Sequence, residues 1–299
     1  MKKRLFKIIR YSGLPFLFRE IIQKNKVTIL LFHNIKPNAA AKVFAYLIKY
    51  YNVISLERFI DAATGKKKED ILPPKSLIIT FDDGHIGNYK LLPIIQKFNI
   101  PVTIFICAAI VGTNRHFWFK KSGIHENLST LTKVSSIERR TILQKSGFEQ
   151  EKAYSKPQAL SKKQIEEMKE YINFQSHTLF HPILPLCDDS EAEEEIIFSK
   201  KRLEKDFGLT VNAISYPNGN YGEREIKYAK ESGYVCGITV DYGYNTLKSD
   251  IFRLKRLSVN DTENIDELIV KASGVWAFFK TKNGRKNGYK NDEYWDINN

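Results

Sequence analysis

The chain has 299 residues, of which 42% are hydrophobic and 27% are charged, and its formal net charge is +13. A chain of this length and composition can bury one large core, and no run in it approaches the ~20 apolar residues of a membrane-spanning helix. Its three cysteines, Cys107, Cys187 and Cys236, have no metal-ligand spacing and are too few for a disulfide framework, which indicates a reducing, cytoplasmic compartment.

Residues 1–26 form the first predicted unit, a basic amphipathic segment. Up to residue 30 the chain has eight lysine and arginine residues against Glu20 alone, with apolar residues between them. This pattern is typical of a segment that lies on an anionic membrane surface, here the inner face. It is equally compatible with an apolar face that packs on the rest of the protein. A secretory signal is disfavoured, because the longest apolar stretch is short and contains Pro15.

The basic excess could also indicate a nucleic-acid partner. The sequence contains no recognition-helix, zinc-finger or RNA-binding signature, and its charge gathers at the N-terminus rather than around the candidate site described below. We therefore expect no nucleic-acid partner.

Residues 27–280 form the second predicted unit, in which apolar strand-like runs alternate with amphipathic helical stretches. This alternation predicts a single α/β domain with a parallel sheet that is closed, or nearly closed, as a barrel. The predicted strands are 27–32, 52–56, 76–81, 102–107, 171–175, 211–216, 234–240 and 252–259, and the predicted helices are 41–51, 57–64, 89–98, 162–170, 191–207 and 223–232.

Two segments depart from this alternation. Residues 111–157 are longer than an ordinary connection between a strand and a helix, which predicts an inserted lid or wall at the catalytic end of the barrel. The aromatic Trp118 in this insertion could stack on a sugar ring or anchor the loop locally. Residues 281–299 are polar and rich in Asn, Lys and Gly, and we expect them to form a disordered tail.

The strongest functional signal is a set of carboxylates and imidazoles at the ends of predicted strands. Asp82 and Asp83 follow one apolar run, and His177 and His181 follow another. In a parallel α/β protein, residues at the carboxyl ends of several strands build the active site. One carboxylate and two imidazoles are a common ligand set for a divalent metal. If Asp83 is the ligand, Asp82 remains beside it to accept a proton from water that the metal acidifies, which predicts hydrolysis.

These residues lie in two motifs that resemble those of the polysaccharide deacetylases of the NodB-homology type, also called carbohydrate esterase family four. The sequence Thr80-Phe81-Asp82-Asp83-Gly84 matches the first motif in full, and His177-Thr178-Leu179-Phe180-His181 matches the second. The resemblance implies an irregular (β/α)7-type barrel, with Asp82 as general base and Asp83, His177 and His181 as ligands of a divalent metal, commonly zinc.

The third family motif is only partly present, as Ser215-Tyr216-Pro217-Asn218-Gly219, with Ser215 where the family has an arginine that orients the base. By analogy with the family, the backbone N–H of Asn218 points at the developing oxyanion. Arg256, in the last predicted strand, is a possible substitute for the missing arginine. We expect Tyr216 and Pro217, with Trp118 of the insertion, to contact the substrate.

The family's usual general acid is also missing, because no histidine follows His181. His33 is the replacement candidate, since it ends the first apolar run and should face the same mouth as Asp82. Deacetylases of extracellular and surface polysaccharides in this superfamily likewise begin with a strand ending in Tyr/Phe-His, and the chain looks most like that branch. A purely structural role for His33 remains open, and His85 is a weaker alternative.

The function predicted from these residues is metal-dependent removal of N-acetyl groups from an N-acetylated sugar. The glycan would be a surface polysaccharide or its lipid-linked precursor. Two alternatives remain. The same chemistry could act on O-acetyl esters or on a non-sugar amide, and the barrel could bind glycan without catalysis.

Overall fold

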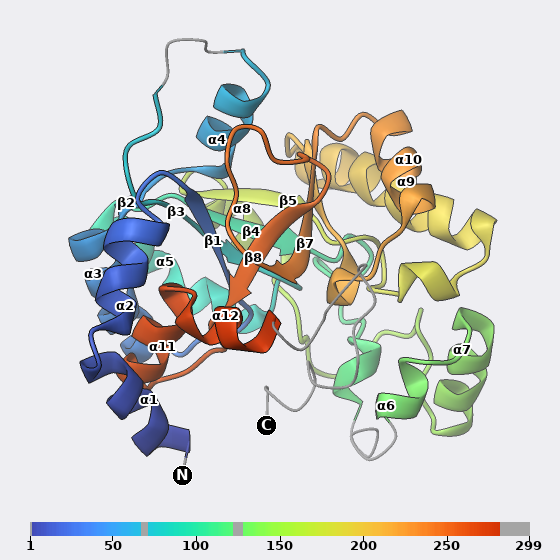
Figure 1. Cartoon of the computed structure of the whole chain (residues 1–299). Coiled ribbons are helices and arrows are strands. Elements are labelled where there is room, and N and C mark those ends of the chain that lie inside the picture. The colour runs from blue at the N-terminus through green and yellow to red at the C-terminus, as the bar shows by residue number, and fades with distance from the viewer. Residues whose placement is uncertain (1, 67–70, 122–127, 282–299) are drawn as a thin grey trace.

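A closed parallel barrel of seven strands forms the centre of the protein (Figure 1). The computed structural model describes residues 2–66, 71–121 and 128–281. The barrel closes because β1 pairs in parallel with both β3 and β8. A short additional strand, β2 (Asn52–Val53), pairs with the start of β3. The strands of the barrel are β1 (Val27–Phe32), β3 (Ser76–Phe81), β4 (Val102–Ile106), β5 (Ile172–Ser176), β6 (Ala213–Ser215), β7 (Cys236–Tyr242) and β8 (Leu254–Ser258).

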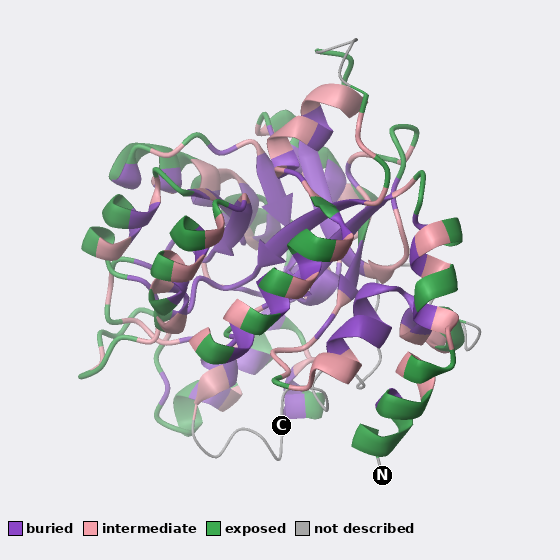
Figure 2. Cartoon of the chain, turned by 90° about the vertical axis from the view of Figure 1, so that its left-hand side faces the viewer, coloured by how far each residue is buried: buried purple, intermediate pink, exposed green. Residues whose placement is uncertain are grey.

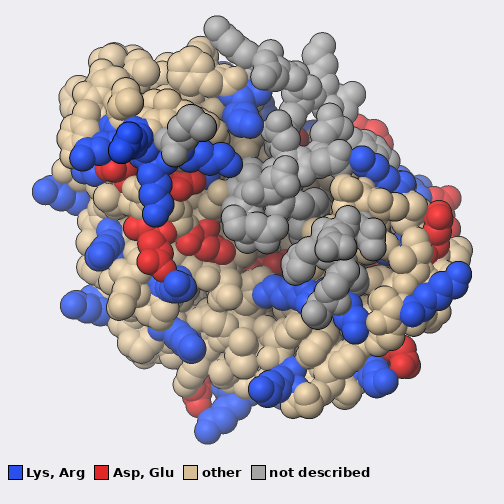
Figure 3. All heavy atoms as spheres, turned by 90° about the horizontal axis from the view of Figure 1, so that it is seen from below, with Lys and Arg blue, Asp and Glu red and all other residues tan. Residues whose placement is uncertain are grey.

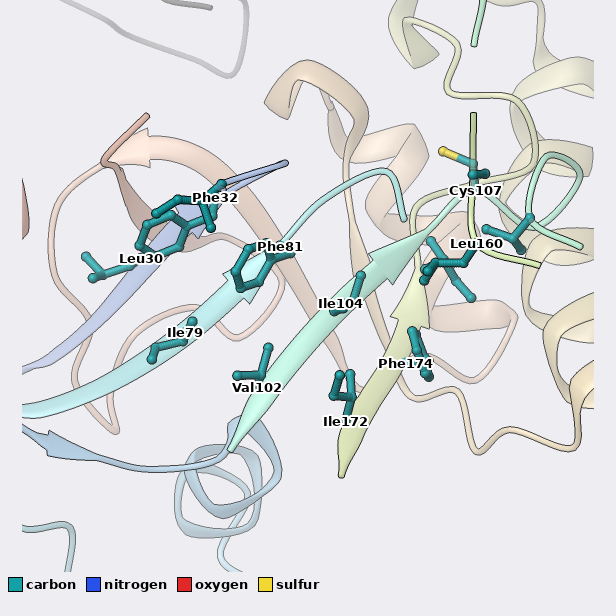
Figure 4. Close-up of a cluster of buried hydrophobic side chains, with 14 of the residues drawn as sticks. Leu30, Phe32, Ile79, Phe81, Val102, Ile104, Cys107, Leu160, Ile172 and Phe174 are labelled. Carbon is teal, nitrogen blue, oxygen red and sulfur yellow. The ribbon is translucent and has the colours of Figure 1, made fainter. Parts of the chain in front are cut away.

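β1, β3 and β4 are largely apolar on both faces because helices cover the outside and side chains fill the inside, whereas β5 and β8 also carry polar residues. Alternate residues project outwards into one large cluster with the surrounding helices, as Leu30 and Phe32 of β1 and Ile79 and Phe81 of β3 do (Figure 4). The residues between them point inwards, and Ile29, Ile78 and their counterparts on the other strands fill the barrel. This alternation decides which side chains reach the mouth of the barrel at the strand ends.

Six helical segments follow strands at the places that the sequence predicts. Their ends have ordinary chemical causes: Ser161 and Gln164 form a capping box at the start of α8, and α9 begins after the Asp188 cap and stops at Gly208, which has a left-handed backbone. The segments are α3 (Pro37–Tyr50), α4 (Leu56–Ala63), η2 with α5 (Ile86–Leu91, Leu92–Phe98), α8 (Lys162–Met168), α9 (Asp189–Phe207) and α10 (Glu223–Glu231).

Several boundaries differ from the sequence prediction. The strand predicted at 52–56 ends at Val53, because the Ser55 side chain accepts a hydrogen bond from the Arg58 N–H and so caps α4. The strand predicted at 211–216 shortens to Ala213–Ser215. Two helices that were not predicted, α11 (Ile265–Ala272) and α12 (Val275–Thr281), follow the last strand. The tail predicted at 281–299 lies, beyond residue 281, outside the described residues.

The N-terminal segment forms α1 (Lys2–Tyr11), α2 (Leu14–Leu17) and η1 (Phe18–Ile22). One side of α1 packs on the domain: the Phe6 ring lies 4.9 Å from that of Trp276, and Arg10 pairs with Asp266. The other side of α1 is exposed (Figure 2). Packing on the domain, one of the two expected alternatives, therefore accounts for one face of the helix. No helix within the described ranges has both the length and the apolar character needed to cross a bilayer.

In its described part, the insertion predicted at 111–157 contains three short helical segments. They are η3 (Trp118–Lys120), α6 (Leu128–Leu131) and α7 (Ser136–Lys145). The insertion lies on the side of the barrel towards which the strands point (Figure 1). It is therefore placed to contribute side chains to the mouth.

Candidate active site

The candidate site lies at the mouth of the barrel, where inward-facing positions of four strands or their first following residues meet. Asp82 follows β3, His177 follows β5, Ser215 ends β6 and Arg256 belongs to β8. Each of the four is nearly or fully buried. Because side chains alternate along a strand, Asp82, Ser215 and Arg256 share the inward direction of the barrel-filling residues Ile78, Ala213 and Leu254.

A sharp turn after β3 brings two consecutive carboxylates to the same place. In a continuing strand Asp82 and Asp83 would point to opposite faces, but Asp83 has a positive φ of 74° and ends the strand. Gly84 follows with φ 78°, and a Cβ there would lie 2.6 Å from Ile106 Cγ2. Only glycine fits this backbone and this contact. The turn leaves Asp83 Oδ1 3.5 Å and Asp82 Oδ2 3.8 Å from the same atom, His177 Nε2.

Asp83, His177 and His181 converge as the sequence predicted. Their potential ligand atoms all lie within 4.8 Å of one another, and Asp83 Oδ1 is 3.4 Å from His181 Nε2. His177 Nδ1 donates to the Ser215 carbonyl at 2.7 Å, which leaves Nε2 free to bind a metal. Asp83 Oδ1 is buried and accepts no hydrogen bond from any described residue. This donor set and the unsatisfied oxygen fit a divalent cation such as zinc.

The charges at this cluster are also consistent with a cation. Burial lowers the pKa of His181 to about 3, so its imidazole is neutral, the form that binds metals. Burial alone would lower the pKa of His177 as well, but the nearby carboxylates of Asp82 and Asp83 raise it overall. The two buried carboxylates therefore attract a positive charge, which a divalent ion would supply more fully than a proton.

Two residues outside the motifs hold the loop between the histidines. The Glu195 carboxylate, on α9, accepts hydrogen bonds from the N–H groups of Leu179 and Phe180 at 2.7 and 3.0 Å. Burial raises the pKa of Glu195 to about 7 despite these donors. Trp118 Nε1 donates to the His181 carbonyl at 2.9 Å. Sequence reasoning missed Glu195, because it lies in an acidic helical run that looks like a solvated face.

The position of Trp118 contradicts its predicted role as a substrate contact. The side chain is 4% exposed, and its ring lies under the Arg139 guanidinium at 5.0 Å. A ring buried in this way cannot stack on a sugar. Trp118 instead anchors the loop that carries His181, which is the local role the sequence left open.

Arg256 lies against Asp82. Its two terminal nitrogens donate to the two carboxylate oxygens at 2.8 and 2.7 Å, and Nη2 also donates to Ser215 Oγ at 2.9 Å. Arg256 Nε donates to the Thr239 carbonyl at 2.7 Å. Burial raises the pKa of Asp82, but Arg256 and His177 outweigh it, so the pKa is lowered overall and the carboxyl is ionised at neutral pH. An arginine from β8 thus occupies the place beside the base for which the family motif would provide one.

The three predicted site residues in and before the turn after β6 differ in whether they can contact a substrate. Asn218 is buried with φ 55°, and the hydrogen bonds of the turn use the N–H groups of Gly219 and Asn220, leaving that of Asn218 uncommitted among the described residues. Pro217 is buried within the same turn. Tyr216 faces outwards, is fully buried and stacks on Tyr221 at 5.0 Å, so its side chain cannot contact a substrate.

His33 lies at the mouth, as predicted from its place after β1. Its backbone N–H donates to Asp261 at 2.9 Å, and Asn88 Nδ2 donates to its carbonyl at 2.7 Å. The imidazole is close enough to help lower the pKa of Asp82. Its effect on that pKa is smaller than the effects of burial, Arg256 and His177. It is half-buried, so it can reach both the site and a ligand in the mouth.

Both ring nitrogens of His85 have polar partners, and one of these partners is Asp83 of the candidate ligand cluster. Its Nε2 lies 3.0 Å from Asp83 Oδ2, and Lys120 of the insertion donates to its Nδ1 at 2.9 Å. Burial lowers the pKa of both His85 and Lys120. With both ring nitrogens engaged, His85 is better suited to orient Asp83 than to protonate a leaving group. Nothing in the sequence indicated that Lys120 would reach this cluster.

Comparisons with known proteins agree with this arrangement. The sequence model described as polysaccharide deacetylase matches residues 69–237. The protein YxkH of Bacillus subtilis is 24% identical over 247 residues, covering 79% of this chain and 72% of its own. The poly-beta-1,6-N-acetyl-D-glucosamine N-deacetylase of Staphylococcus epidermidis is 25% identical over 274 residues, covering 80% and 81%.

Among solved structures, IcaB from Ammonifex degensii superposes with a TM-score of 0.61 at 18% identity, covering 83% of this chain and 98% of its own. At that identity the superposition supports the barrel fold alone. The family match spans the strand-end carboxylates and both histidines, and it covers more than half of the sequence. This chain belongs to the polysaccharide deacetylase family of hydrolases.

Proposed function

We propose that this protein is a metal-dependent N-deacetylase of an N-acetylated sugar in a surface polysaccharide or its lipid-linked precursor. The observation that carries the proposal is the convergence of Asp83, His177 and His181 next to the ionised, arginine-bound Asp82. The substrate class is supported by the Staphylococcus epidermidis relative, which is named for N-deacetylation of poly-beta-1,6-N-acetyl-D-glucosamine.

The reaction would add water to the acetamide carbonyl and break its C–N bond. Asp83, His177 and His181 would hold a divalent cation, which would supply the Lewis acidity that polarises a carbonyl and acidifies water. Asp82 accepts the proton of that water, and Arg256 holds the carboxylate in place. The Asn218 N–H stabilises the developing oxyanion. His33 donates a proton to the leaving nitrogen, so the products are acetate and a free amine.

The test is acetate release from N-acetylglucosamine oligomers. We expect turnover by the purified protein with zinc, loss of turnover after chelation, and recovery when zinc is returned. Parallel assays with an O-acetylated sugar and a non-sugar acetamide determine which acyl group is preferred. Acetate release that is unaffected by complete metal removal would contradict the proposal, as would oligomer binding without any release.

Loss of a metal ligand should empty the site without unfolding the barrel. In His181→Ala the site keeps only two of its three ligands, so we expect bound zinc to fall from stoichiometric to trace levels, measured by elemental analysis after dialysis. His116→Ala is the matched control, because among the described residues His116 hydrogen-bonds the Lys156 carbonyl and stacks on Tyr154, both within the insertion. Full zinc occupancy in His181→Ala would refute the ligand assignment.

The acid role of His33 predicts a selective loss. In His33→Ala we expect hydrolysis of an N-acetyl sugar to fall by about 10²-fold or more, because the leaving amine must be protonated. Hydrolysis of an activated aryl acetate should hardly change, because its leaving group needs no proton. Equal losses on both substrates in steady-state assays would assign His33 a structural role.

A further inference from the structure

The N-terminal helix has an exposed apolar face that packing on the domain does not explain. Only Phe6 of α1 is buried, whereas Leu5, Ile8 and Tyr11 on the same helix are 44%, 68% and 71% exposed. Figure 2 shows this helix standing out from the body of the protein with most of its surface exposed. Large apolar side chains grouped on the surface of a soluble protein usually mark a site of interaction.

Neighbouring segments enlarge this face. After the turn at Gly13, α2 and η1 expose Phe16, Leu17 and Ile21. The Phe18 ring of η1 lies 5.5 Å from that of Phe278 on α12, next to the exposed Phe279. We call these residues the docking face: Leu5, Ile8, Tyr11, Phe16, Leu17, Ile21, Phe278 and Phe279.

Basic side chains accompany the docking face. Arg10 and Arg19 form ion pairs with Asp266 and Glu20 of the protein itself. The remaining basic residues of α1 are all exposed: Lys2, Lys3 and Arg4 are consecutive at the start of the helix, and Lys7 lies between Phe6 and Ile8. An apolar face bordered by cations matches the chemistry of an anionic bilayer, in which acyl chains lie beneath negative headgroups.

We propose that the docking face binds the surface of an anionic lipid bilayer. A second copy of the chain is a poorer partner, because a twofold contact through α1 would bring two clusters of lysine and arginine together. A nucleic acid would match the charge but would leave the apolar side chains without a partner. Lipid is the occupant that satisfies both the charge and the apolar surface.

The α1 part of the docking face lies on the same side of the molecule as the mouth of the barrel, whereas η1 lies beside the starts of β1 and β3, where Glu20 pairs with Lys75. α1 pairs through Arg10 with Asp266 near the start of α11, shortly after the end of β8. β8 points towards the end of the protein where α1, α11 and α12 lie (Figure 1). Seen from that end, the surface carries several separate groups of Lys and Arg side chains, with Asp and Glu side chains between some of them (Figure 3). A bilayer bound here would place the mouth near glycans attached to the membrane, a consequence that rests on the proposed function.

Vesicle co-sedimentation of the full chain tests the proposal. We expect binding to vesicles of phosphatidylcholine with phosphatidylglycerol, weak binding to phosphatidylcholine alone, and weakening of the binding by salt. Ile8→Ser with Phe16→Ser, and separately Lys3→Gln with Lys7→Gln, should each lower the partition coefficient by about tenfold or more. Ile137→Ser is the matched control, since Ile137 on α7 is 61% exposed and lies outside the docking face.

Acetate release from soluble oligomers should stay unchanged in all of these variants, which separates membrane docking from the proposed function. Equal binding to neutral and anionic vesicles would overturn the proposal, as would unaltered binding by both double variants. A dimer in sedimentation equilibrium that Ile8→Ser with Phe16→Ser dissociates would assign the docking face to a second copy of the chain instead.

Discussion

Replacing Asp82 by Asn is expected to lower the turnover number for N-acetylglucosamine oligomers by about 10²–10⁴-fold. The amide has nearly the shape of the carboxylate but cannot accept the proton of the attacking water. Asp83, His177 and His181 are untouched by the change, so bound zinc should remain stoichiometric. The measurement is steady-state acetate release at saturating zinc, with metal content determined on the same sample.

A matched aspartate provides the control. Asp188 caps α9 by accepting a hydrogen bond from the Glu191 N–H, and asparagine caps helices equally well. Asp188→Asn should therefore keep both turnover and stability. If Asp82→Asn retained most of the wild-type rate with its zinc in place, another group would have to accept the proton.

Replacing Arg256 by Met is expected to lower the free energy of unfolding by about 3–5 kcal/mol, because it leaves the Asp82 carboxylate buried without its cation. The same change should raise the pKa of Asp82, since burial, which already raises it, would lose its main opposing partner. The base must be ionised to act, so the acidic limb of the activity profile should move to higher pH. Urea unfolding and a pH profile measure the two effects.

The control for Arg256→Met is an arginine of the same protein in a solvent-exposed ion pair. Arg253 pairs with Glu223 and Asp250 near the surface, and Arg253→Met should cost no more than about 1 kcal/mol. In the double variant Asp82→Asn with Arg256→Met, the losses should be less than additive, because the two residues share one interaction. Equal stability losses in Arg256→Met and Arg253→Met would show that the buried pair has no special importance.

The sequence by itself determined the parts of the protein that depend on local pattern. The bounds of β1 and β3 agree with the apolar runs at 27–32 and 76–81, since a strand buried on both faces is an uninterrupted apolar stretch. The convergence of the candidate metal ligands was also predictable, because Asp83, His177 and His181 follow such runs and the ends of parallel strands share one mouth.

One misplaced residue could have been corrected from the sequence alone. Ser215 and Tyr216 are neighbours at the end of a strand, so their side chains must point to opposite sides. Once Ser215 is placed in the mouth as the counterpart of the family's arginine, Tyr216 has to face the surrounding helices. The structure places both residues in this way.

Only the tertiary structure decided which distant residues complete the site. The sequence offered Arg256 as a candidate, but its contact with Asp82 depends on closure of the barrel, in which β1 lies between β3 and β8. Glu195, Trp118 and Lys120 support the candidate metal ligands from a helix and an insertion, and their sequence neighbourhoods show no sign of it. Long-range packing positions these side chains, and a periodicity in the sequence reports only on which face of its own element a residue lies.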